Sequence, residues 1–227
     1  MLLEKVVAIV ALSATLMDGS MKAALPDKNM DGTAFLVNRQ HAVSKYFEPD
    51  TRKVNGPGMS QAMRPDAAQA LEEMFAAARE DGINLSIVSG YRSYSKQSTI
   101  YSRKKAEQGQ EAADRISARP GTSEHQLGLA MDLAKKGSTQ LNTAFGKTDE
   151  GKWVSAHAHE YGFIVRYLEG SEDVTGYMYE PWHVRYVGKA LAKELYESGL
   201  PMETFLSGYK LEVYDYLIHQ ATNEVLP

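Results

Sequence analysis

Two pairs of a histidine with a carboxylate stand out in this chain as groups that could bind a metal ion and transfer protons. His125 precedes Asp132 by seven positions, and Glu180 precedes His183 by three. The chain has no cysteine, so imidazole and carboxylate groups are its candidate ligands for a transition metal. Two histidines and Asp132 would give Zn²⁺ three ligands and leave a fourth position for water, as in catalytic zinc sites. Glu180 then remains as a general acid/base that could take a proton from water and return it to a leaving amine.

The residues around the first pair indicate how it is positioned. Residues 127–133 alternate large apolar residues with small or polar ones, which is the period-two pattern of a strand. This pattern places Gly128, Ala130 and Asp132 on one face, where small side chains let a metal ion and its water approach. His125 is an odd number of positions from Asp132, so a turn must bring its imidazole to that face. A single histidine is more often structural than a ligand, and the metal interpretation rests on the coincidence of two pairs with the small-residue floor.

Helix and strand patterns along the chain predict the elements that hold these residues. Large apolar residues recur at helical spacing after Pro65, and short apolar runs bounded by glycine indicate strands. From these elements we expect an α+β fold, in which a small, mainly antiparallel sheet carries the zinc site and helices surround it. The expected elements are helices over residues 65–81, 95–108, 153–161 and 189–198, a short helix from 201, a polar loop over 135–150, and strands over 85–89, 127–133, 163–167 and 182–187.

Length and composition limit the class of protein. The chain has 227 residues, of which 43% are hydrophobic, so one globular domain with a sizeable core is expected. A net charge of -4 leaves no basic excess, which argues against nucleic-acid binding. Residues 1–17 form an apolar segment too short to be a typical membrane span, and we interpret it as an export signal or an uncleaved anchor, with a buried N-terminal helix as the alternative. Residues 18–33 are expected to be a linker, and residues 34–227 the folded domain with a C-terminal helical tail.

Three sequence blocks together point to a known family. Residues 123–132 read SEHQLGLAMD, residues 180–188 read EPWHVRYVG, and residues 89–97 read SGYRSYSKQ. They resemble the Ser-x-His-x-x-Gly-x-Ala-x-Asp, Glu-x-Trp-His-x-Arg-Tyr-Val-Gly and Ser-Gly-Tyr-Arg-Ser motifs of the VanY-type D-alanyl-D-alanine carboxypeptidases, a family of zinc peptidases that includes L,D-carboxypeptidases. The blocks keep the family's order within residues 34–207, which makes the resemblance specific.

The resemblance implies roles for individual residues. It assigns zinc to the same three ligands and the role of catalytic base to Glu180. It adds Arg92, implied to stabilise the oxyanion of the tetrahedral intermediate. It also adds Ser123 and Gln97 as substrate-binding residues. Several relatives have glycine where this chain has Glu124, and we expect this negative charge near the metal to alter substrate preference.

The function that the resemblance implies is a zinc-dependent carboxypeptidase that removes the C-terminal D-alanine from peptidoglycan stem peptides. Such an enzyme acts outside the cytoplasmic membrane, in the bacterial cell envelope or as a secreted protein. The alternatives are an L,D-carboxypeptidase acting on tetrapeptide stems and a non-catalytic, zinc-containing module that binds wall peptides. Glu180 favours turnover, because binding alone needs no proton transfer. A monomer is favoured, with the stem peptide as partner, no nucleic acid, and membrane contact only through an N-terminal anchor.

Overall fold

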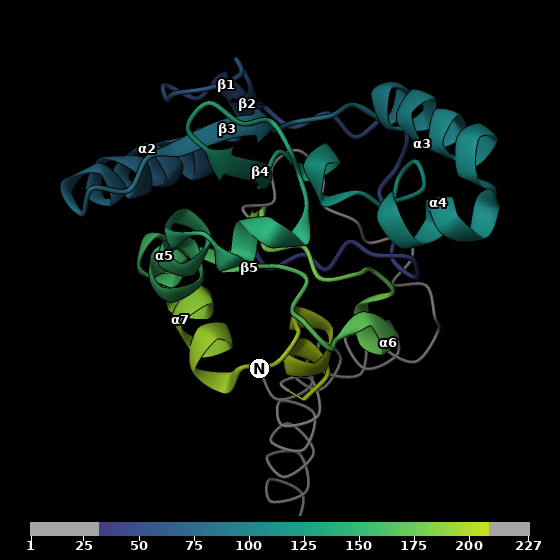
Figure 1. Cartoon of the computed structure of the whole chain (residues 1–227). Helices are drawn as coiled ribbons and strands as arrows, with labels where there is room; N and C mark the ends of the chain where they lie inside the picture. Colours follow the sequence, from purple (N-terminus) through teal and green to yellow (C-terminus); the bar gives the residue numbers. More distant parts are fainter. Residues whose placement is uncertain (1–31, 209–227) are drawn as a thin grey trace, which may run out of the picture.

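The structure, a computed structural model, describes residues 32–208 and combines helices with two antiparallel sheets (Figure 1). The expected apolar segment 1–17, residues 18–31 of the linker and the tail from residue 209 lie outside the described residues. The domain boundaries therefore remain predictions. Within residues 32–208, no helix combines the length and the apolar character that crossing a membrane would require.

A four-stranded sheet lies at the centre of the described residues. Its strand order is β3-β4-β6-β5, and each neighbouring pair is antiparallel. This confirms the expected α+β fold with a small antiparallel sheet. The strands are β3 (Leu85–Ser89), β4 (Ala130–Lys135), β5 (Phe163–Val165) and β6 (His183–Tyr186), and a separate two-stranded sheet pairs β1 (Arg52–Lys53) with β2 (Ala62–Met63).

The helices form two groups around this sheet. Helix α2 contacts β3, α5 contacts β4 and β5, and α7 contacts β5, so these three helices cover the apolar core. Helices α3 and α4 pack against each other and lie apart from α5 and α7 in Figure 1. The helix bounds are α2 (Pro65–Glu80), α3 (Tyr94–Gln108), α4 (Gln110–Ile116), α5 (Asp149–His157), α6 (Glu172–Thr175) and α7 (Lys189–Ser198).

The expected strand over residues 127–133 begins later than its sequence pattern indicated. Residues Glu124–Leu127 form a 3₁₀ helix, and Gly128 ends it with a φ of 69°. The strand starts only at Ala130. The prediction that Gly128 lies on a strand face is therefore wrong. The turn that carries His125 needs a left-handed residue at its end, and Gly128 supplies it.

Other boundaries also differ from the sequence expectation. Helix α5 starts inside the expected 135–150 loop, because the Thr148 side chain accepts a hydrogen bond from the Gly151 amide at 3.1 Å and caps the helix. The expected 153–161 helix is thus the end of α5 followed by a 3₁₀ helix, Ala158–Tyr161. The sequence patterns did not predict β1, β2, α4 or α6.

Close packing at Gly128 generates a prediction that can be tested against a matched glycine. Gly82 has a similar φ of 77°, but a Cβ there would meet nothing within 4 Å, whereas a Cβ at Gly128 would lie 3.3 Å from the backbone nitrogen of Arg64. We expect Gly128→Ala to lower the free energy of unfolding by about 1 kcal/mol more than Gly82→Ala, because only the first adds a steric conflict to the backbone strain. Urea-induced unfolding measures both values. Equal losses would contradict a packing requirement at Gly128.

Candidate active site

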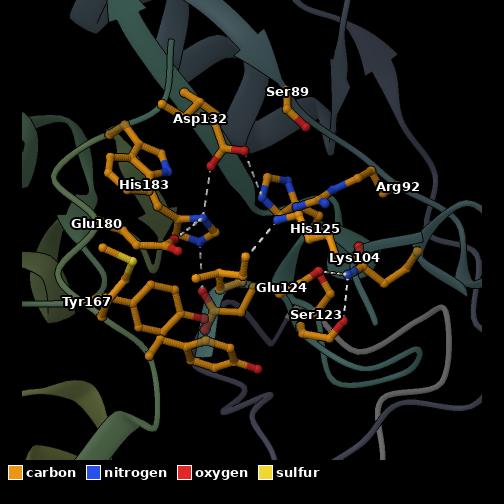
Figure 2. A pocket seen from close by; sticks show the side chains of 18 of the residues that line it. Ser89, Arg92, Lys104, Ser123, Glu124, His125, Asp132, Tyr167, Glu180 and His183 are labelled. Atoms are coloured by element: carbon orange, nitrogen blue, oxygen red, sulfur yellow. Dashed lines mark hydrogen bonds and ion pairs between the residues drawn. The ribbon is translucent and has the colours of Figure 1, made fainter. Parts of the chain in front are cut away.

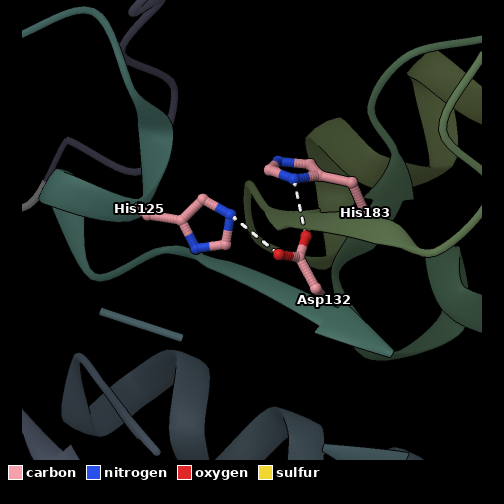
Figure 3. A group of neighbouring side chains, drawn as sticks. All are labelled: His125, Asp132 and His183. Atoms are coloured by element: carbon pink, nitrogen blue, oxygen red, sulfur yellow. Dashed lines mark hydrogen bonds and ion pairs between the residues drawn. The ribbon is translucent and has the colours of Figure 1, made fainter. Parts of the chain in front are cut away.

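Three side chains that the sequence singled out as zinc ligands converge in the structure (Figure 3). The β4–β6 register places Asp132 directly opposite His183, and the 3₁₀ helix Glu124–Leu127 brings His125 to the same point. The Asp132 carboxylate lies 3.4 Å from Nε2 of His125 and 3.0 Å from Nδ1 of His183. All three side chains are buried. The predicted turn at His125 is confirmed.

Hydrogen bonding leaves one nitrogen of His125 without a partner. Nδ1 of His125 donates to the Gly90 carbonyl oxygen at 2.8 Å, which makes Nε2 the acceptor nitrogen of the neutral ring. Nε2 is buried and has no hydrogen-bond partner in the structure. A buried nitrogen of this kind needs a partner, and a cation supplies one. Tetrahedral zinc separates nitrogen and oxygen ligands by about 3.4 Å, close to the spacing between His125 and Asp132, so these residues fit the ion.

The electrostatics of the cluster also favour a bound cation. Burial lowers the pKa of His125 to about 4, so its ring is neutral, as a metal ligand must be. Burial opposes charge on Asp132 as well, but the imidazoles of His125 and, to a smaller extent, His183 hold its pKa well below its usual range. Burial would also lower the pKa of His183, yet the carboxylates of Asp132 and Glu124 raise it to about 9. The two carboxylates thus stabilise positive charge at this position.

Glu180 lies beside the cluster in a position suited to proton transfer. Its carboxylate is 3.9 Å from Nδ1 of His183, and its side chain is 13% exposed. Its backbone is fixed on both sides, because its amide donates to the Tyr167 carbonyl and its carbonyl accepts from the His183 amide, each at 3.1 Å. Burial raises the pKa of Glu180 to about 7. A carboxyl group with this pKa can take up and release a proton near neutral pH.

A cavity of about 430 Å³ opens onto the cluster and gathers the other residues implied by the resemblance (Figure 2). Arg92, Gln97 and Ser123 all line it. The Arg92 amide donates to the His125 carbonyl at 3.1 Å, which ties the arginine to the ligand turn. Burial lowers the pKa of Arg92, while Asp132 and other nearby anions oppose this effect. The structure thus brings these residues together in one cavity, as the sequence predicted.

Gln97 and Ser123 differ in how far the protein already satisfies them. The Gln97 Nε2 atom donates to the Ala118 carbonyl at 2.7 Å, and its Oε1 atom is buried without a partner. Gln97 therefore offers a hydrogen-bond acceptor to the cavity. The Ser123 side chain is also buried and lies close to the ligand turn. Both are placed where an extended peptide chain could be hydrogen-bonded.

Glu124 lies close to the candidate metal ligands, as the sequence predicted, but its buried ion pairs were not foreseen. Its Oε1 atom accepts from Nε of Arg166 and from Nη1 of Arg185, both at 2.7 Å, and its side chain is fully buried. Its Oε2 atom lies 3.5 Å from Nε2 of His183. Arg166 is in turn paired with Glu203 at 2.6 Å. Glu124 thus contacts His183 on the ring nitrogen that points away from Asp132. Arg166 and Arg185 balance the charge of Glu124.

Comparison with known proteins supports the same assignment. Residues 60–189 match the family model described as VanY, D-alanyl-D-alanine carboxypeptidase. The protein YodJ of Bacillus subtilis (strain 168), which is a carboxypeptidase by name, is 41% identical over 191 residues, covering 81% of this chain and 70% of that protein.

Two solved structures resemble this chain closely. The LdcB LD-carboxypeptidase aligns with a TM-score of 0.72 and 43% identity, covering 76% of this chain and 84% of that one. A mutant of a D,D-pentapeptidase VanY from a VanB-type vancomycin resistance cassette, solved in complex with Zn(II), aligns with a TM-score of 0.67 and 33% identity, covering 77% of this chain and 98% of that one. These identities are high enough for the likeness to extend beyond the fold.

Replacing a ligand should remove metal without unfolding the protein. We expect His125→Ala to weaken zinc binding by more than about 100-fold, because it removes a ligand and not only its support. Competition with a chelator, followed by mass spectrometry of the bound metal, measures this effect. His157→Ala is the control, since that side chain is 41% exposed and pairs with Glu160 outside the cavity. A full zinc complement in His125→Ala would refute the ligand assignment.

Removing Glu124 should cost stability. Glu124→Ala leaves two buried arginines short of their shared partner, and breaking a buried ion pair costs about 3–5 kcal/mol. Urea-induced unfolding of the zinc-free protein measures this loss separately from metal binding. The matched control is Glu107→Ala on α3, where the side chain is 58% exposed and the expected change is within about 0.5 kcal/mol. Similar losses of unfolding free energy in the two variants would contradict a stabilising role for the ion pairs of Glu124 with Arg166 and Arg185.

Proposed function

Because this chain belongs to the VanY family of D-alanyl-D-alanine carboxypeptidases, which are zinc peptidases, we propose that it removes the C-terminal D-alanine from peptidoglycan stem peptides by hydrolysis. One observation carries this proposal. The buried ligand cluster of His125, Asp132 and His183 lies beside Glu180 in a cavity that Arg92 also lines. These are the groups that hydrolysis of a peptide bond requires in one place.

The proposed chemistry divides between the metal site and Glu180. His125, Asp132 and His183 would hold a zinc ion, which when bound polarises the scissile carbonyl and acidifies water. The Glu180 carboxylate accepts a proton from the attacking water as the new carbon–oxygen bond forms. It then gives that proton to the nitrogen of the leaving D-alanine as the carbon–nitrogen bond breaks. A pKa of about 7 suits both transfers.

Arg92 stabilises the negative charge that develops on the carbonyl oxygen. Its Nε atom is buried without a hydrogen-bond partner, so the guanidinium retains a donor for the reaction. Its amide is fixed to His125, which holds the arginine near the reacting carbonyl. Gln97 and Ser123 bind the substrate, with the Gln97 Oε1 atom accepting a peptide N–H. A fixed donor in a partly dry site lowers the barrier more than a mobile donor in water does.

Removal of D-alanine from a tetrapeptide stem is a second candidate. The observation in its favour is the identity of 43% with the LdcB LD-carboxypeptidase, against 33% with the D,D-pentapeptidase VanY. The two reactions share the same bond-breaking chemistry and differ in the configuration of the residue before the scissile bond. The shape of the cavity near that residue, and not the zinc ligands, would decide between them.

We also place the activity outside the cytoplasmic membrane, in the cell envelope or the surrounding medium. The proposed substrate, the stem peptide of peptidoglycan, is found there. Residues 1–17 would supply export or an anchor. Fractionation of cells followed by N-terminal mass spectrometry of the mature protein tests this location and shows whether the segment is removed.

Turnover should depend on zinc and on Glu180. The purified protein is incubated with a stem pentapeptide or a stem tetrapeptide, with zinc or after chelation, and the products are identified by mass spectrometry. We expect zinc-dependent loss of one alanine from the pentapeptide. Glu180→Gln should bind zinc normally but lose about 10²–10⁴-fold in kcat, because glutamine cannot carry the proton.

Glu107→Gln, exposed on α3, should leave kcat unchanged. Cleavage of the tetrapeptide alone would move the assignment to an L,D-carboxypeptidase. Bound zinc without cleavage of either peptide would favour the non-catalytic binding module. Normal turnover by Glu180→Gln would remove Glu180 from the mechanism.

A further inference from the structure

Lys104 is a second cation in the active-site cavity, and the mechanism above gives it no role. Among the described residues that line this cavity, the lysine and arginine side chains are those of Arg92 and Lys104. The Lys104 side chain is half-buried, although the lysine beside it on the helix, Lys105, is exposed. Burying part of a lysine costs free energy unless an anion compensates for it. Glu180 and Asp132 compensate part of this cost, but none of the described carboxylates forms an ion pair with Lys104, so its ammonium is available to an anion that enters the cavity.

The backbone around the cavity fixes the Lys104 ammonium in place. Lys104 follows Gln97 by seven positions on α3, so both side chains lie on the same face of the helix. Gln97 donates to the Ala118 carbonyl at 2.7 Å, and Nζ of Lys104 donates to the Ile116 carbonyl at 3.0 Å. This bond uses one of three ammonium hydrogens. The other two remain for a ligand.

The charges of the cavity show which kind of ligand the ammonium suits. Asp132 and Glu180 are acidic groups on the same cavity, and they would repel a bound anion. Burial lowers the pKa of Lys104, whereas Glu180 and Asp132 counteract this shift. In Figure 2, Arg92, Lys104 and Ser123 lie on the side of His125 away from Glu180. Arg92 and Lys104 thus lie together on one side of the cavity, where they attract an anion, although Glu180 is near enough to act on the charge of Lys104.

A carboxypeptidase must hold a carboxylate that has left water, and a buried carboxylate requires a cation or several hydrogen bonds. Arg92 is already engaged with the carbonyl oxygen in the proposed mechanism. We propose that Nζ of Lys104 binds the C-terminal carboxylate of the substrate peptide, with the Ser123 hydroxyl as an additional donor. This assignment rests on the proposed function. It also gives a physical reason for cleavage at a free C-terminus in preference to cleavage inside a cross-link.

The test compares two substrates that differ only in this carboxylate. One is a stem peptide ending in free D-alanine, and the other ends in D-alanine amide. Lys104→Met keeps most of the linear apolar part of the side chain and removes the ammonium group. We expect it to lower kcat/KM for the free acid by about 10- to 100-fold, mainly through KM, because a charge-assisted hydrogen bond is lost. The amide should be cleaved as well as by the wild type, so the preference for the acid disappears.

Two further variants make the result specific. Lys104→Arg retains the charge and should keep most of the preference for the free acid. Lys105→Met, on the same helix but exposed outside the cavity, should behave as the wild type. An unchanged preference in Lys104→Met would overturn the proposal. Equal losses for acid and amide would also overturn it, because Lys104 would then act on another part of the peptide or on the shape of the cavity.

A binding experiment separates this proposal from the proposed function. Calorimetric titration of zinc-loaded Glu180→Gln with the acid and the amide measures recognition without turnover. We expect tighter binding of the acid, and loss of that difference when Lys104→Met is added. If the wild type cleaves neither peptide, the proposed function fails, while this titration still decides whether Lys104 binds a terminal carboxylate. Equal binding of acid and amide would refute the role of Lys104.

Discussion

The site depends on one pairing register, which sets Asp132 of β4 opposite His183 of β6. Residues directly opposite one another in an antiparallel pair have Cβ atoms about 4.5–5.5 Å apart, so their side chains can meet on the same face. Here they approach to 3.0 Å. A slip of one residue would send one of the two side chains to the other face of the sheet. Because β4 and β6 are the inner strands, the neighbouring strands hold this register on both sides.

The third candidate ligand, His125, comes from a turn outside the sheet, and further residues orient the two histidines. The left-handed Gly128 ends the turn that carries His125, and the Gly90 carbonyl orients the imidazole. Behind His183, Glu124 is held by two buried arginines that come from other parts of the chain. Such surroundings restrict how far a ligand can rotate, which is how residues beyond the metal ligands tune a metal site. The sheet provides the position of the site, and the turn and the ion cluster provide its orientation.

Three buried carboxyl groups near the site have different protonation behaviour because their partners differ. Glu124 is paired with Arg166 and Arg185 and lies near His183, and Asp132 lies between His125 and His183. These partners hold the pKa of Glu124 and of Asp132 low despite burial. Burial raises the pKa of Glu180 to about 7, because the attraction of His183, 3.9 Å away, is too weak to offset it. Environments that separate the pKa values of similar groups allow one fold to use them for different tasks. In this site, Asp132 suits ligation and Glu180 suits proton transfer.

Elements with a local cause could be predicted from the amino-acid sequence alone. The bounds of β3 and α7 agree with their apolar patterns, and residue types together with motif spacing were enough to select His125, Asp132, His183 and Glu180 as one site. The start of β4 was placed too early, since a turn glycine resembles a small residue on a strand face. Helix α4 was missed because its short polar sequence takes its support from packing against α3.

Which charged groups come into contact depends on the tertiary fold. Glu124 pairs with Arg166 and Arg185, which are 42 and 61 positions away, and no local pattern records that contact. Lys104 reaches the active-site cavity because α3 packs beside the segment that contains Ile116, whereas Lys105 on the same helix is exposed. Helix and strand patterns follow from neighbours along the chain, but burial and ion pairing depend on residues that folding brings together. The class of reaction could therefore be predicted from the candidate zinc-ligating residues and Glu180. The surroundings that set their charge and orientation could be known only from the fold.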